Sequence, residues 1–183
     1  LFLDVLGKRE DQYHNLEMVM APLKLHDVLT FKKNKNGDVN ISMNEKVTDN
    51  IQDNLIFKAV KLLEEKTGKT LNVDIHVEKN IPVAAGLAGG SADAAATLRG
   101  VNKLYRLKLN KETLAKYGAE LGADVPYCIY NKLCIARGKG EKLFFLNRKF
   151  NHDILLINPG IKVSTKAVFE SIDMSQITPR KIT

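Results

Sequence analysis

Pro82-Val83-Ala84-Ala85-Gly86-Leu87-Ala88-Gly89-Gly90-Ser91 is the stretch of sequence that decides the fold. It follows Leu71-Asn72-Val73-Asp74-Ile75-His76-Val77-Glu78, in which apolar and polar residues alternate strictly, the pattern of a half-buried strand. It precedes an Ala-rich segment, from Ser91 to about Tyr105, with high helix propensity. The sequence therefore predicts a strand, a glycine-rich loop and a helix in direct succession.

This order of elements favours the binding of an anion. A helix N-terminus carries unpaired backbone N–H groups and a partial positive charge, which together attract phosphate. Gly86, Gly89 and Gly90 let the backbone approach an anion closely, and Ser91 can bond phosphate oxygens or cap the helix. The spacing matches neither a Walker A motif nor GxGxxG. A purely structural turn is the alternative, but the flanking strand and helix favour phosphate.

The segments before this loop predict several strands and one helix. A strand-like apolar run opens the chain at residues 1–6, and further runs at 16–23, 28–32 and 38–43 indicate strands. Asn36-Gly37, between the last two runs, is typical of a hairpin turn. Asp53-Asn54 offers a cap for a helix with one apolar face, which we expect to end at Gly68.

The segments after the loop predict another helix and a second group of strands. Asn110 is expected to cap a helix that carries Leu114, Tyr117 and Leu121. Strand-like runs follow at residues 127–130, 133–136, 142–146 and 154–157, with a turn at 138–140. Because strands and helices do not alternate regularly, the expected fold class is α+β.

The composition is that of a globular domain. The chain has 183 residues, 44% of them hydrophobic, and no apolar run long enough to span a membrane. No secretion leader and no metal-ligand spacing is found, so Cys128 and Cys134 are expected to be buried reduced thiols in a cytoplasmic protein. The net charge of +7 favours an anionic partner. Nucleic acid is not expected, because no recognition helix or RNP-type aromatic motif is found.

The glycine-rich stretch resembles the phosphate-binding signature of the GHMP kinases, a superfamily that includes galactokinase, homoserine kinase and mevalonate kinase. The matching pattern is Pro82-x3-Gly86-Leu87-x-Gly89-Gly90-Ser91-x2-Ala94-Ala95. Other segments occur in the order found in one branch, whose members phosphorylate a cytidine diphosphate-linked methylerythritol in non-mevalonate isoprenoid synthesis. These segments are Gly7-Lys8-Arg9-x-Asp11-Gln12-Tyr13-His14, Asp53-Asn54-Leu55, Leu121-Gly122-Ala123-Asp124-Val125-Pro126 and Asn158-Pro159-Gly160. The resemblance covers residues 1 to about 172.

The resemblance implies a catalytic role for Asp124. Viewed locally, an aspartate between a helix and Val125-Pro126 is more often a cap or turn residue. The matching aspartate of the family lies beside the acceptor hydroxyl. The resemblance therefore implies that Asp124 orients this hydroxyl and accepts its proton.

The resemblance also implies ATP and Mg²⁺, without assigning a protein ligand to the metal. The residues it places at ATP are Asn54, Leu55, Lys79, Pro82, Val83, Ala84, Ala85, Gly86, Leu87, Ala88, Gly89, Gly90, Ser91 and Ala92. Asn54 and Leu55 are equally explained as a helix cap and a core residue, and Lys79 as a solvated strand-end lysine. Asp93 could help hold Mg²⁺, although the helix macrodipole already explains an acidic residue in a first helical turn.

Three residues are expected at the cytidine of the substrate. By the resemblance, Tyr13 offers a stacking face and His14 offers hydrogen bonds to the pyrimidine edge. Phe169 would close the other side of the base. Ordinary strand-edge packing is the alternative for Tyr13 and His14, and a core position is the alternative for Phe169.

The chain departs from the family pattern at four positions. Gln12 stands where the family usually has glycine, so the turn before Tyr13 is expected to differ. Ala84, Ala85 and Ala88 occupy positions often held by glycine or serine. We expect these alanines to keep a negative φ and to leave room for phosphate.

The resemblance predicts two domains. Residues 1–150 would form the N-terminal ATP-binding domain, with the two layers of a ribosomal-protein-like fold, and residues 151–183 would begin an incomplete C-terminal domain. A catalytic lysine and a substrate-binding asparagine, which the family carries in a Lys-x-Asn segment, are expected before Leu1. The protein is expected to act on a small molecule as a monomer or homodimer, without a membrane or nucleic-acid partner.

Two other functions stay open from the sequence. The chain could be part of another GHMP kinase, of the mevalonate or homoserine kinase type. It could also be a nucleotide-binding or RNA-binding module without catalysis, since the chain is basic and the superfamily fold resembles ribosomal-protein folds.

Overall fold

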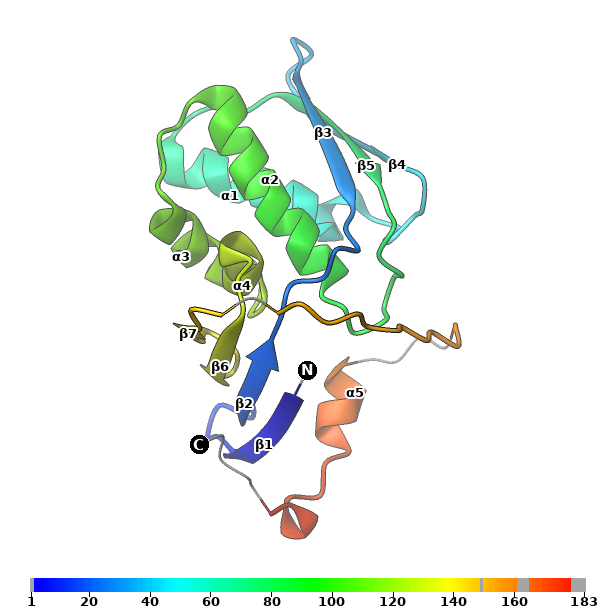
Figure 1. Ribbon diagram of the computed structural model, residues 1–183. Coiled ribbons are helices and arrows are strands. Elements are labelled where there is room, and N and C mark those ends of the chain that lie inside the picture. Colours follow the sequence, from blue (N-terminus) through cyan, green and yellow to red (C-terminus); the bar gives the residue numbers. More distant parts are fainter. Residues whose placement is uncertain (1, 149, 161–164, 179–183) are drawn as a thin grey trace. The chain divides into compact units, whose positions relative to one another are not determined.

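In the computed structural model, which describes residues 2–148, 150–160 and 165–178, the predicted alternating strand is β5 (Val73–Glu78; Figure 1). Val73, Ile75 and Val77 are buried, whereas the residues between them face away from the core. β5 is the middle strand of a three-stranded sheet in the order β3 (Val28–Lys33), β5, β4 (Val39–Met43). β3 pairs with β5 antiparallel and β4 pairs with it parallel.

The predicted hairpin at Asn36-Gly37 is wrong. β3 and β4 lie on either side of this turn in the sequence, but β5 separates them in the sheet. The side chain of Asn34 connects this turn to β5. Its Nδ2 donates hydrogen bonds to the carbonyl oxygen of Asp38 at 3.0 Å and to Oδ1 of Asp74, on β5, at 2.7 Å.

The chain forms two compact units. The first, which we call the helical unit, comprises Lys24–Val83 and Leu87–Tyr130. The second, which we call the sheet unit, comprises Ala84–Gly86 and the described residues of Leu1–Leu23 and Asn131–Thr183. The division into residues 1–150 and 151–183 stays a prediction.

Two long helices of the helical unit cover one face of its sheet (Figure 1). α1 (Leu55–Thr67) begins after the short 3₁₀ turn η1 (Ile51–Asp53) and ends at Gly68, whose φ of 64° closes the last turn. α2 (Gly89–Tyr105) follows the glycine-rich loop. α3 (Lys111–Leu121) begins at Asn110, whose side chain accepts a hydrogen bond from the backbone N–H of Thr113 at 2.8 Å. These caps confirm the predicted helix ends.

A strand was expected at residues 127–130, and the structure has a helix there instead, α4 (Val125–Tyr130). Its β-branched and aromatic residues favour a strand locally, but packing against α2 and α3 decides the conformation. Val125 fits because Gly118 of α3 lacks a side chain: a Cβ there would lie 2.7 Å from Cγ1 of Val125.

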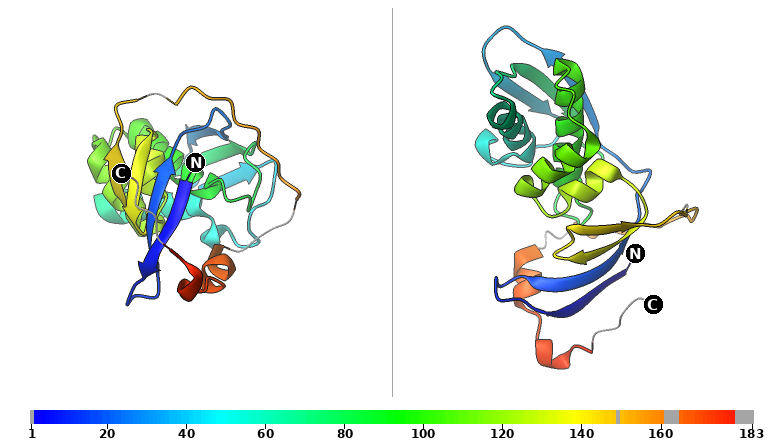
Figure 2. Two further views of the ribbon diagram at one scale, coloured as in Figure 1. Left: turned by 60° about the horizontal axis from the view of Figure 1, so that its bottom comes forward. Right: turned by 90° about the vertical axis from the view of Figure 1, so that its left-hand side faces the viewer.

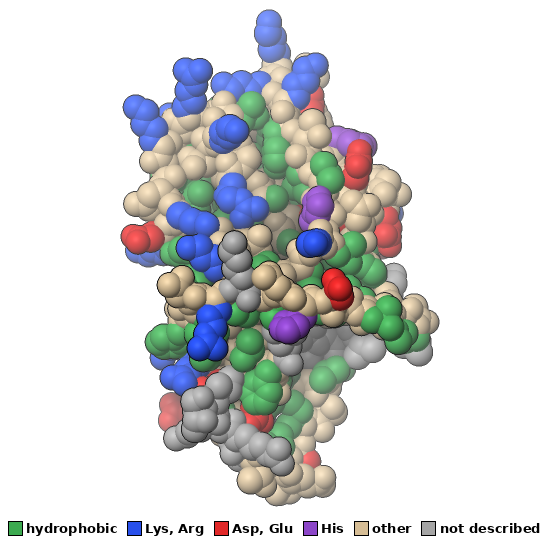
Figure 3. Space-filling view, in the orientation of Figure 1, with side chains coloured by type: hydrophobic (Ala, Val, Ile, Leu, Met, Phe, Trp, Pro, Cys, Tyr) green, Lys and Arg blue, Asp and Glu red, His purple; other side chains and the backbone are tan. Residues whose placement is uncertain are grey.

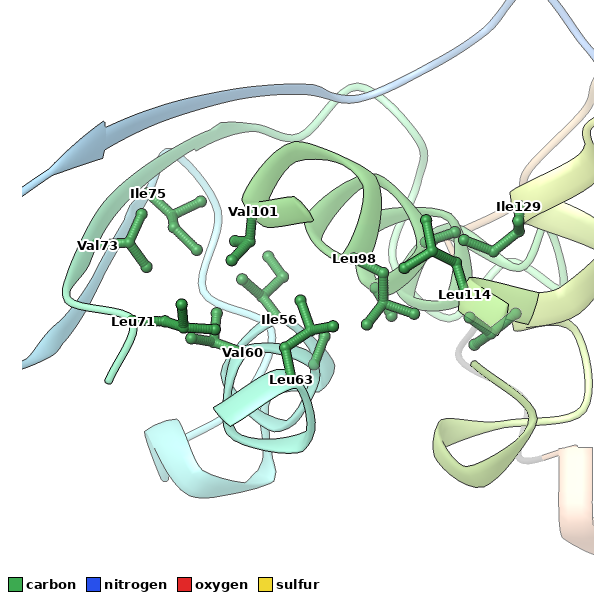
Figure 4. Packing of buried hydrophobic residues seen from close by; sticks show 14 of the residues in the cluster. Ile56, Val60, Leu63, Leu71, Val73, Ile75, Leu98, Val101, Leu114 and Ile129 are labelled. Atoms are coloured by element: carbon green, nitrogen blue, oxygen red, sulfur yellow. The ribbon is translucent and has the colours of Figure 1, made fainter. Parts of the chain in front are cut away.

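The core of the helical unit lies between the sheet and the helices. Figure 4 shows side chains of β5, α1 and α2 pointing toward one another. Ile56, Val60 and Leu63 of α1 meet Leu98 and Val101 of α2, and each of these side chains is at most 1% exposed. Each such side chain contributes about 1.5–3 kcal/mol when buried. The packing therefore holds α2 against α1 and the sheet.

The sheet unit is built on four antiparallel strands, seen on edge in the right-hand view of Figure 2. Their order is β1 (Phe2–Lys8), β2 (His14–Met20), β6 (Cys134–Gly138), β7 (Lys142–Phe145). The predicted turn at residues 138–140 joins β6 to β7. α5 (Thr165–Glu170) and the 3₁₀ turn η2 (Met174–Gln176) follow, and side chains of this segment pack on a small core of Val5, Leu16, Met18 and Ala136.

The strand expected at residues 154–157 is absent from the described structure. The segment has no regular secondary structure, and Leu155 and Ile157 are 85% and 84% exposed. A strand needs a hydrogen-bonded neighbour, and no described strand pairs with this segment.

Candidate active site

The start of α2 has the features of a phosphate site. Ala88 precedes the helix in a left-handed conformation, with φ 54°, and no side chain caps this end. The first helical hydrogen bond runs from the N–H of Ala92 to the carbonyl of Ala88 at 2.9 Å. The N–H groups of Gly89, Gly90 and Ser91 therefore have no carbonyl within the helix and are available to an anion.

The expectation that the loop alanines keep a negative φ is wrong for two of them. Ala84 has φ 57° and Ala88 has φ 54°, whereas Ala85 is not among the residues with positive φ. The path of the loop places both alanines in the left-handed conformation, which glycine adopts without strain. An alanine there costs about 1–2 kcal/mol relative to its preferred conformation.

The segments that the sequence placed at ATP meet at the start of α2. A Cβ on Gly90 would lie 3.5 Å from Cδ1 of Leu55. Asn54 is buried, and its Oδ1 accepts the N–H of Ile56 at 2.9 Å, so its role as a helix cap is confirmed. Its role at ATP stays a prediction. Leu55 is half-buried against the core and borders the glycine-rich helix start.

Lys79 is buried, which corrects the alternative of a solvated strand-end lysine. Its side chain is 3% exposed, and Nζ lies 2.5 Å from Oδ2 of Asp27 and 2.7 Å from Oδ2 of Asp93. Burial lowers the pKa of Lys79, but the two carboxylates outweigh burial and raise it. The macrodipole explanation required Asp93 to lie in the first helical turn. Asp93 is instead the fifth residue of α2 and is 5% exposed. Asp27 was missed, since its partner is 52 positions away and no local pattern marks it.

Asp124 lies directly before α4, at the end of the turn that follows α3. It is half-buried, and burial raises the pKa of its carboxyl. A Cβ on Gly122, two residues earlier, would lie 3.9 Å from Oγ of Ser91. The turn that carries Asp124 therefore borders the start of α2. Burial, with a smaller contribution from the Asp124 charge, also raises the pKa of Cys128 to about 12, so this thiol is not a nucleophile.

In the sheet unit, two of the three residues predicted at cytidine lie together. The rings of His14 and Phe169 stack with centroids 5.5 Å apart and planes inclined by 25°. His14 is buried, whereas Tyr13 is 60% exposed. Nζ of Lys139 lies 4.6 Å from the centroid of the Tyr13 ring, a contact that the sequence analysis missed. Phe169 also packs on the core of the sheet unit, so both interpretations of this residue remain compatible with its position.

The turn before Tyr13 keeps the shape that a glycine would favour. Gln12 has φ 67°, which is the left-handed region. The N–H of Gln12 donates to the carbonyl of Arg9 at 3.2 Å, and the N–H of Arg9 donates to the carbonyl of Tyr13 at 2.8 Å. Asp11 holds the turn from its side chain, through Oδ1, which accepts Nε of Arg9 at 3.1 Å. Gln12 therefore carries backbone strain that a glycine at this position would avoid.

The surface of the helical unit carries scattered positive charge. Figure 3 shows Lys and Arg side chains spread over the face formed by α1, α2 and β3. Cys128 and Cys134 are free thiols, as predicted; Cys134 is buried as expected, whereas Cys128 is half-buried. The described residues contain no group of three or more His, Cys, Asp and Glu side chains that could hold a metal ion. None of the described helices has the length and apolar character needed to cross a membrane.

The part of the chain that carries the glycine-rich helix start matches a known protein family. Residues 54–132, which carry α1, β5, α2, α3 and α4, match the family described as GHMP kinases N terminal domain. The described helices and strands form the α+β fold expected from the sequence, and the matched family belongs to the superfamily that the glycine-rich stretch resembles.

Along nearly its whole length, the chain resembles one enzyme of this superfamily, 4-diphosphocytidyl-2-C-methyl-D-erythritol kinase. It is 43% identical over 176 residues to the protein of that name from Macrococcus caseolyticus (strain JCSC5402). It is 45% identical over 175 residues to the one from Clostridium novyi (strain NT). Both matches cover 96% of this chain and 62% of the relative, so the chain spans about 62% of the length of these curated relatives.

Solved structures agree with this resemblance. A crystal structure of 4-(cytidine 5'-diphospho)-2C-methyl-D-erythritol kinase matches with a TM-score of 0.78 at 32% identity, over 97% of this chain and 62% of that chain. A crystal structure of homoserine kinase from Cytophaga hutchinsonii matches with a TM-score of 0.66 at 19% identity, over 88% of this chain and 56% of that chain. The second likeness shows a shared fold alone.

Proposed function

We propose that the chain belongs to an ATP-dependent kinase that phosphorylates the 2-hydroxyl of 4-diphosphocytidyl-2-C-methyl-D-erythritol, in the non-mevalonate route to isoprenoid precursors. The observation that carries the proposal is the 43–45% identity, along 96% of the chain, to proteins named for this activity. The uncapped start of α2 and the nearby Asp124 supply the phosphate site and the acid–base group that such a kinase needs.

The residues at the start of α2 fit a nucleotide phosphate. The N–H groups of Gly89, Gly90 and Ser91 are left open by the helix, and no side chain caps them. Gly89 packs closely on the segment that follows β5: a Cβ there would lie 3.1 Å from Cγ2 of Ile81. ATP would supply the phosphoryl group, and Leu55 beside Gly90 would offer an apolar contact to the nucleoside. Pro82 to Ala88 would complete the loop around the phosphates.

Asp124 would orient the acceptor hydroxyl and take its proton as the new oxygen–phosphorus bond forms. Positioning and charge stabilisation account for most of the catalysis of phosphoryl transfer, so the base mainly needs to be well placed. Among the described residues, no hydrogen bond ties up the Asp124 carboxylate, and burial raises its pKa. A carboxylate with these properties is a stronger base than an exposed aspartate.

Tyr13, His14 and Phe169 would bind the cytidine of the substrate. Aromatic rings offer stacking faces to a pyrimidine, and a histidine nitrogen can hydrogen-bond to its edge. The short distance between the His14 and Phe169 rings supports a shared role for these two residues. Lys139, held over the Tyr13 ring, places a positive charge at the same turn.

The proposal includes Mg²⁺, which would neutralise phosphate charge and take most of its ligands from the nucleotide, as it commonly does. It also includes a cytoplasmic location, small-molecule substrates, and a monomer or homodimer. Residues 1–150 would form the N-terminal domain of the enzyme, and residues 151–183 would begin its second domain.

A substrate panel on the full-length protein that carries this chain tests the proposal. Turnover of ATP is measured with 4-diphosphocytidyl-2-C-methyl-D-erythritol, mevalonate and homoserine in parallel. We expect activity with the first substrate alone, inhibited competitively by CDP. Activity with mevalonate or homoserine, and no effect of CDP, would assign the chain to another GHMP kinase. RNA binding without ATP turnover would point to a binding module.

A further inference from the structure

Lys79 and two aspartates form a buried charged cluster beneath the glycine-rich loop. The side chains of Lys79, Asp27 and Asp93 are 3%, 2% and 7% exposed. Two carboxylates share one ammonium group, since Nζ of Lys79 lies within 2.7 Å of an oxygen from each. Burying three charges is costly unless each finds its partners, so the geometry of this cluster is tightly constrained.

The cluster fixes the backbone that leads into the loop. Oδ1 of Asp27 accepts the N–H groups of Asn80 at 2.6 Å and Ile81 at 2.8 Å. Asn44 bonds both backbone groups of Lys79: its Oδ1 accepts the N–H at 2.8 Å, and its Nδ2 donates to the carbonyl at 3.3 Å. The three residues before Pro82 are therefore held by the side chains of Asp27, directly before β3, and Asn44, directly after β4.

The same cluster reaches the backbone that leaves the loop. Asp93 belongs to α2, and its Oδ2 accepts Nζ of Lys79 at 2.7 Å. Nζ lies 3.6 Å from the position that a Cβ of Gly89 would occupy, directly beneath the first residue of the helix. Lys79 thus joins the two ends of the loop, which are the end of β5 and the start of α2.

The ammonium of Lys79 is poorly suited to contact a nucleotide. It is buried, and it is shared between two carboxylates. Oδ1 of Asp93 is also buried and has no hydrogen-bond partner among the described residues. The Lys79–Asp93 pair is the ion pair that holds the Asp93 carboxylate, and its loss would remove this link between the helix start and the strand end.

We propose that Lys79 is a positioning residue for ATP, which holds the start of α2 at the distance from β5 that the phosphate loop requires, without touching the nucleotide. This inference rests on the proposed function. It predicts that loss of the link to Asp93 weakens the binding of ATP and leaves the binding of the cytidylyl substrate unchanged. A displacement of about 1 Å in such a site can lower the rate by about a hundredfold.

The test uses Asp93→Asn in the full-length protein, because this variant keeps the shape and leaves the Lys79–Asp27 pair intact. We expect the Kd of ATP, measured by titration calorimetry, and the KM for ATP to rise about tenfold. The KM for the cytidylyl substrate should stay within about twofold, and the melting temperature at pH 7 should not fall below the wild-type value. Glu17→Gln is the matched control: Glu17 is 2% exposed and bonds Arg137 at 2.7 Å, in the sheet unit. It should leave the affinity for ATP unchanged.

Lys79→Met extends the test, although it leaves two buried carboxylates without their cation. It should weaken ATP binding at least as much as Asp93→Asn. The double variant Lys79→Met, Asp93→Leu removes one of the two carboxylates, so it should recover part of the melting temperature but not the affinity for ATP. Unchanged ATP affinity in Asp93→Asn would overturn the inference, and so would equal losses for both substrates with a lowered melting temperature. A wild-type protein that neither binds nor turns over ATP would instead overturn the proposed function.

Discussion

Oγ of Ser91 lies 3.9 Å from the position that a Cβ of Gly122 would occupy. Ser91 is in the first turn of α2, and Gly122 ends α3 two residues before Asp124. The contact brings the serine of the phosphate loop and the turn of the expected catalytic base together within one compact unit. The two groups are 33 positions apart in the sequence, and the packing of α2, α3 and α4 is what joins them.

Substitutions at Gly122 should distinguish an effect on the stability of the fold from an effect on ATP binding. Gly122 has φ 174°, which any residue adopts, and a Cβ would meet Cγ2 of Val125 at an ordinary 3.7 Å. Gly122→Ala should therefore change the free energy of unfolding by less than about 0.5 kcal/mol. Gly122→Leu reaches Ser91 and should weaken ATP binding about tenfold. Urea unfolding measures the stability of both variants, and titration calorimetry measures their affinity for ATP. Equal ATP affinities of Gly122→Ala and Gly122→Leu would show that the contact between Gly122 and Ser91 does not affect nucleotide binding.

The loop alanines offer a matched pair of stability measurements. Ala88 has φ 54°, so Ala88→Gly relieves left-handed strain and should stabilise the protein by about 0.5–1 kcal/mol. Ala85 is outside the positive-φ residues, so Ala85→Gly should destabilise it by about 0.4–1 kcal/mol. Opposite shifts in melting temperature would bear out the loop geometry. Two shifts of the same sign would contradict it.

These left-handed alanines mark the limit of what the sequence could predict. The strand at β5, the caps at Asn54, Gly68 and Asn110, and the helix after the loop depend on local pattern and were predicted. The positive φ of Ala84 and Ala88 is imposed by the path of the loop, so alanine propensity misled the prediction. The hairpin at Asn36-Gly37 failed for a similar reason, since β5 enters between strands that are adjacent in the sequence.

The residues of the candidate site likewise fall into those that a local motif predicts and those that depend on long-range contacts. The glycines, Asp124, Tyr13 and His14 could be selected from short motifs. The burial of Lys79 could not, because it depends on Asp27, 52 positions earlier, and on Asp93, 14 positions later. Long-range ion pairs leave no periodic signal in a single sequence. The helix at α4 was missed because its residues favour a strand locally, and only tertiary packing makes them helical.

The stability of the protein should depend on pH through Asp93. Burial raises the pKa of Asp93 to about 6, from 3.8, and outweighs the attraction of Lys79; Asp27 and Cys128 also face this carboxyl. The pKa of Asp93 is higher in the folded protein than in the unfolded chain. The stability that Asp93 contributes is therefore fully present below pH 3.8 and is lost as the pH rises through about 6.

Between about pH 4 and pH 7, wild type should therefore lose up to about 3 kcal/mol of stability relative to Asp93→Asn, which cannot titrate. Urea unfolding of both proteins at the two pH values measures the difference. For comparison, burial raises the pKa of Asp27, but the N–H of Ile81 and the ammonium of Lys79 outweigh burial and hold it below its usual value. The stability that ionised Asp27 contributes is therefore lost only in more acidic solution, as the pH falls through that lowered pKa. A constant difference between wild type and Asp93→Asn would show that Asp93 does not titrate in this range.

The aromatic residues of the sheet unit should affect one substrate only. Tyr13 is 60% exposed, so Tyr13→Ala should leave the melting temperature nearly unchanged and raise the KM for the cytidylyl substrate about tenfold or more, the value of a lost stacking contact. Tyr13→Phe keeps the ring and is the matched control. The KM for ATP should be unaffected in both. A rise in both KM values, or none in Tyr13→Ala, would remove Tyr13 from the pyrimidine site.

The most direct measurement is the kcat of Asp124→Asn with 4-diphosphocytidyl-2-C-methyl-D-erythritol in the full-length protein. Asp49→Asn is the control, since the Asp49 side chain is 98% exposed. If Asp124 takes the proton of the acceptor hydroxyl, kcat should fall about a hundred- to ten-thousand-fold, while ATP binding and the melting temperature stay close to those of Asp49→Asn. Asp124→Asn with the kcat of the control would contradict the assignment of Asp124 as the base.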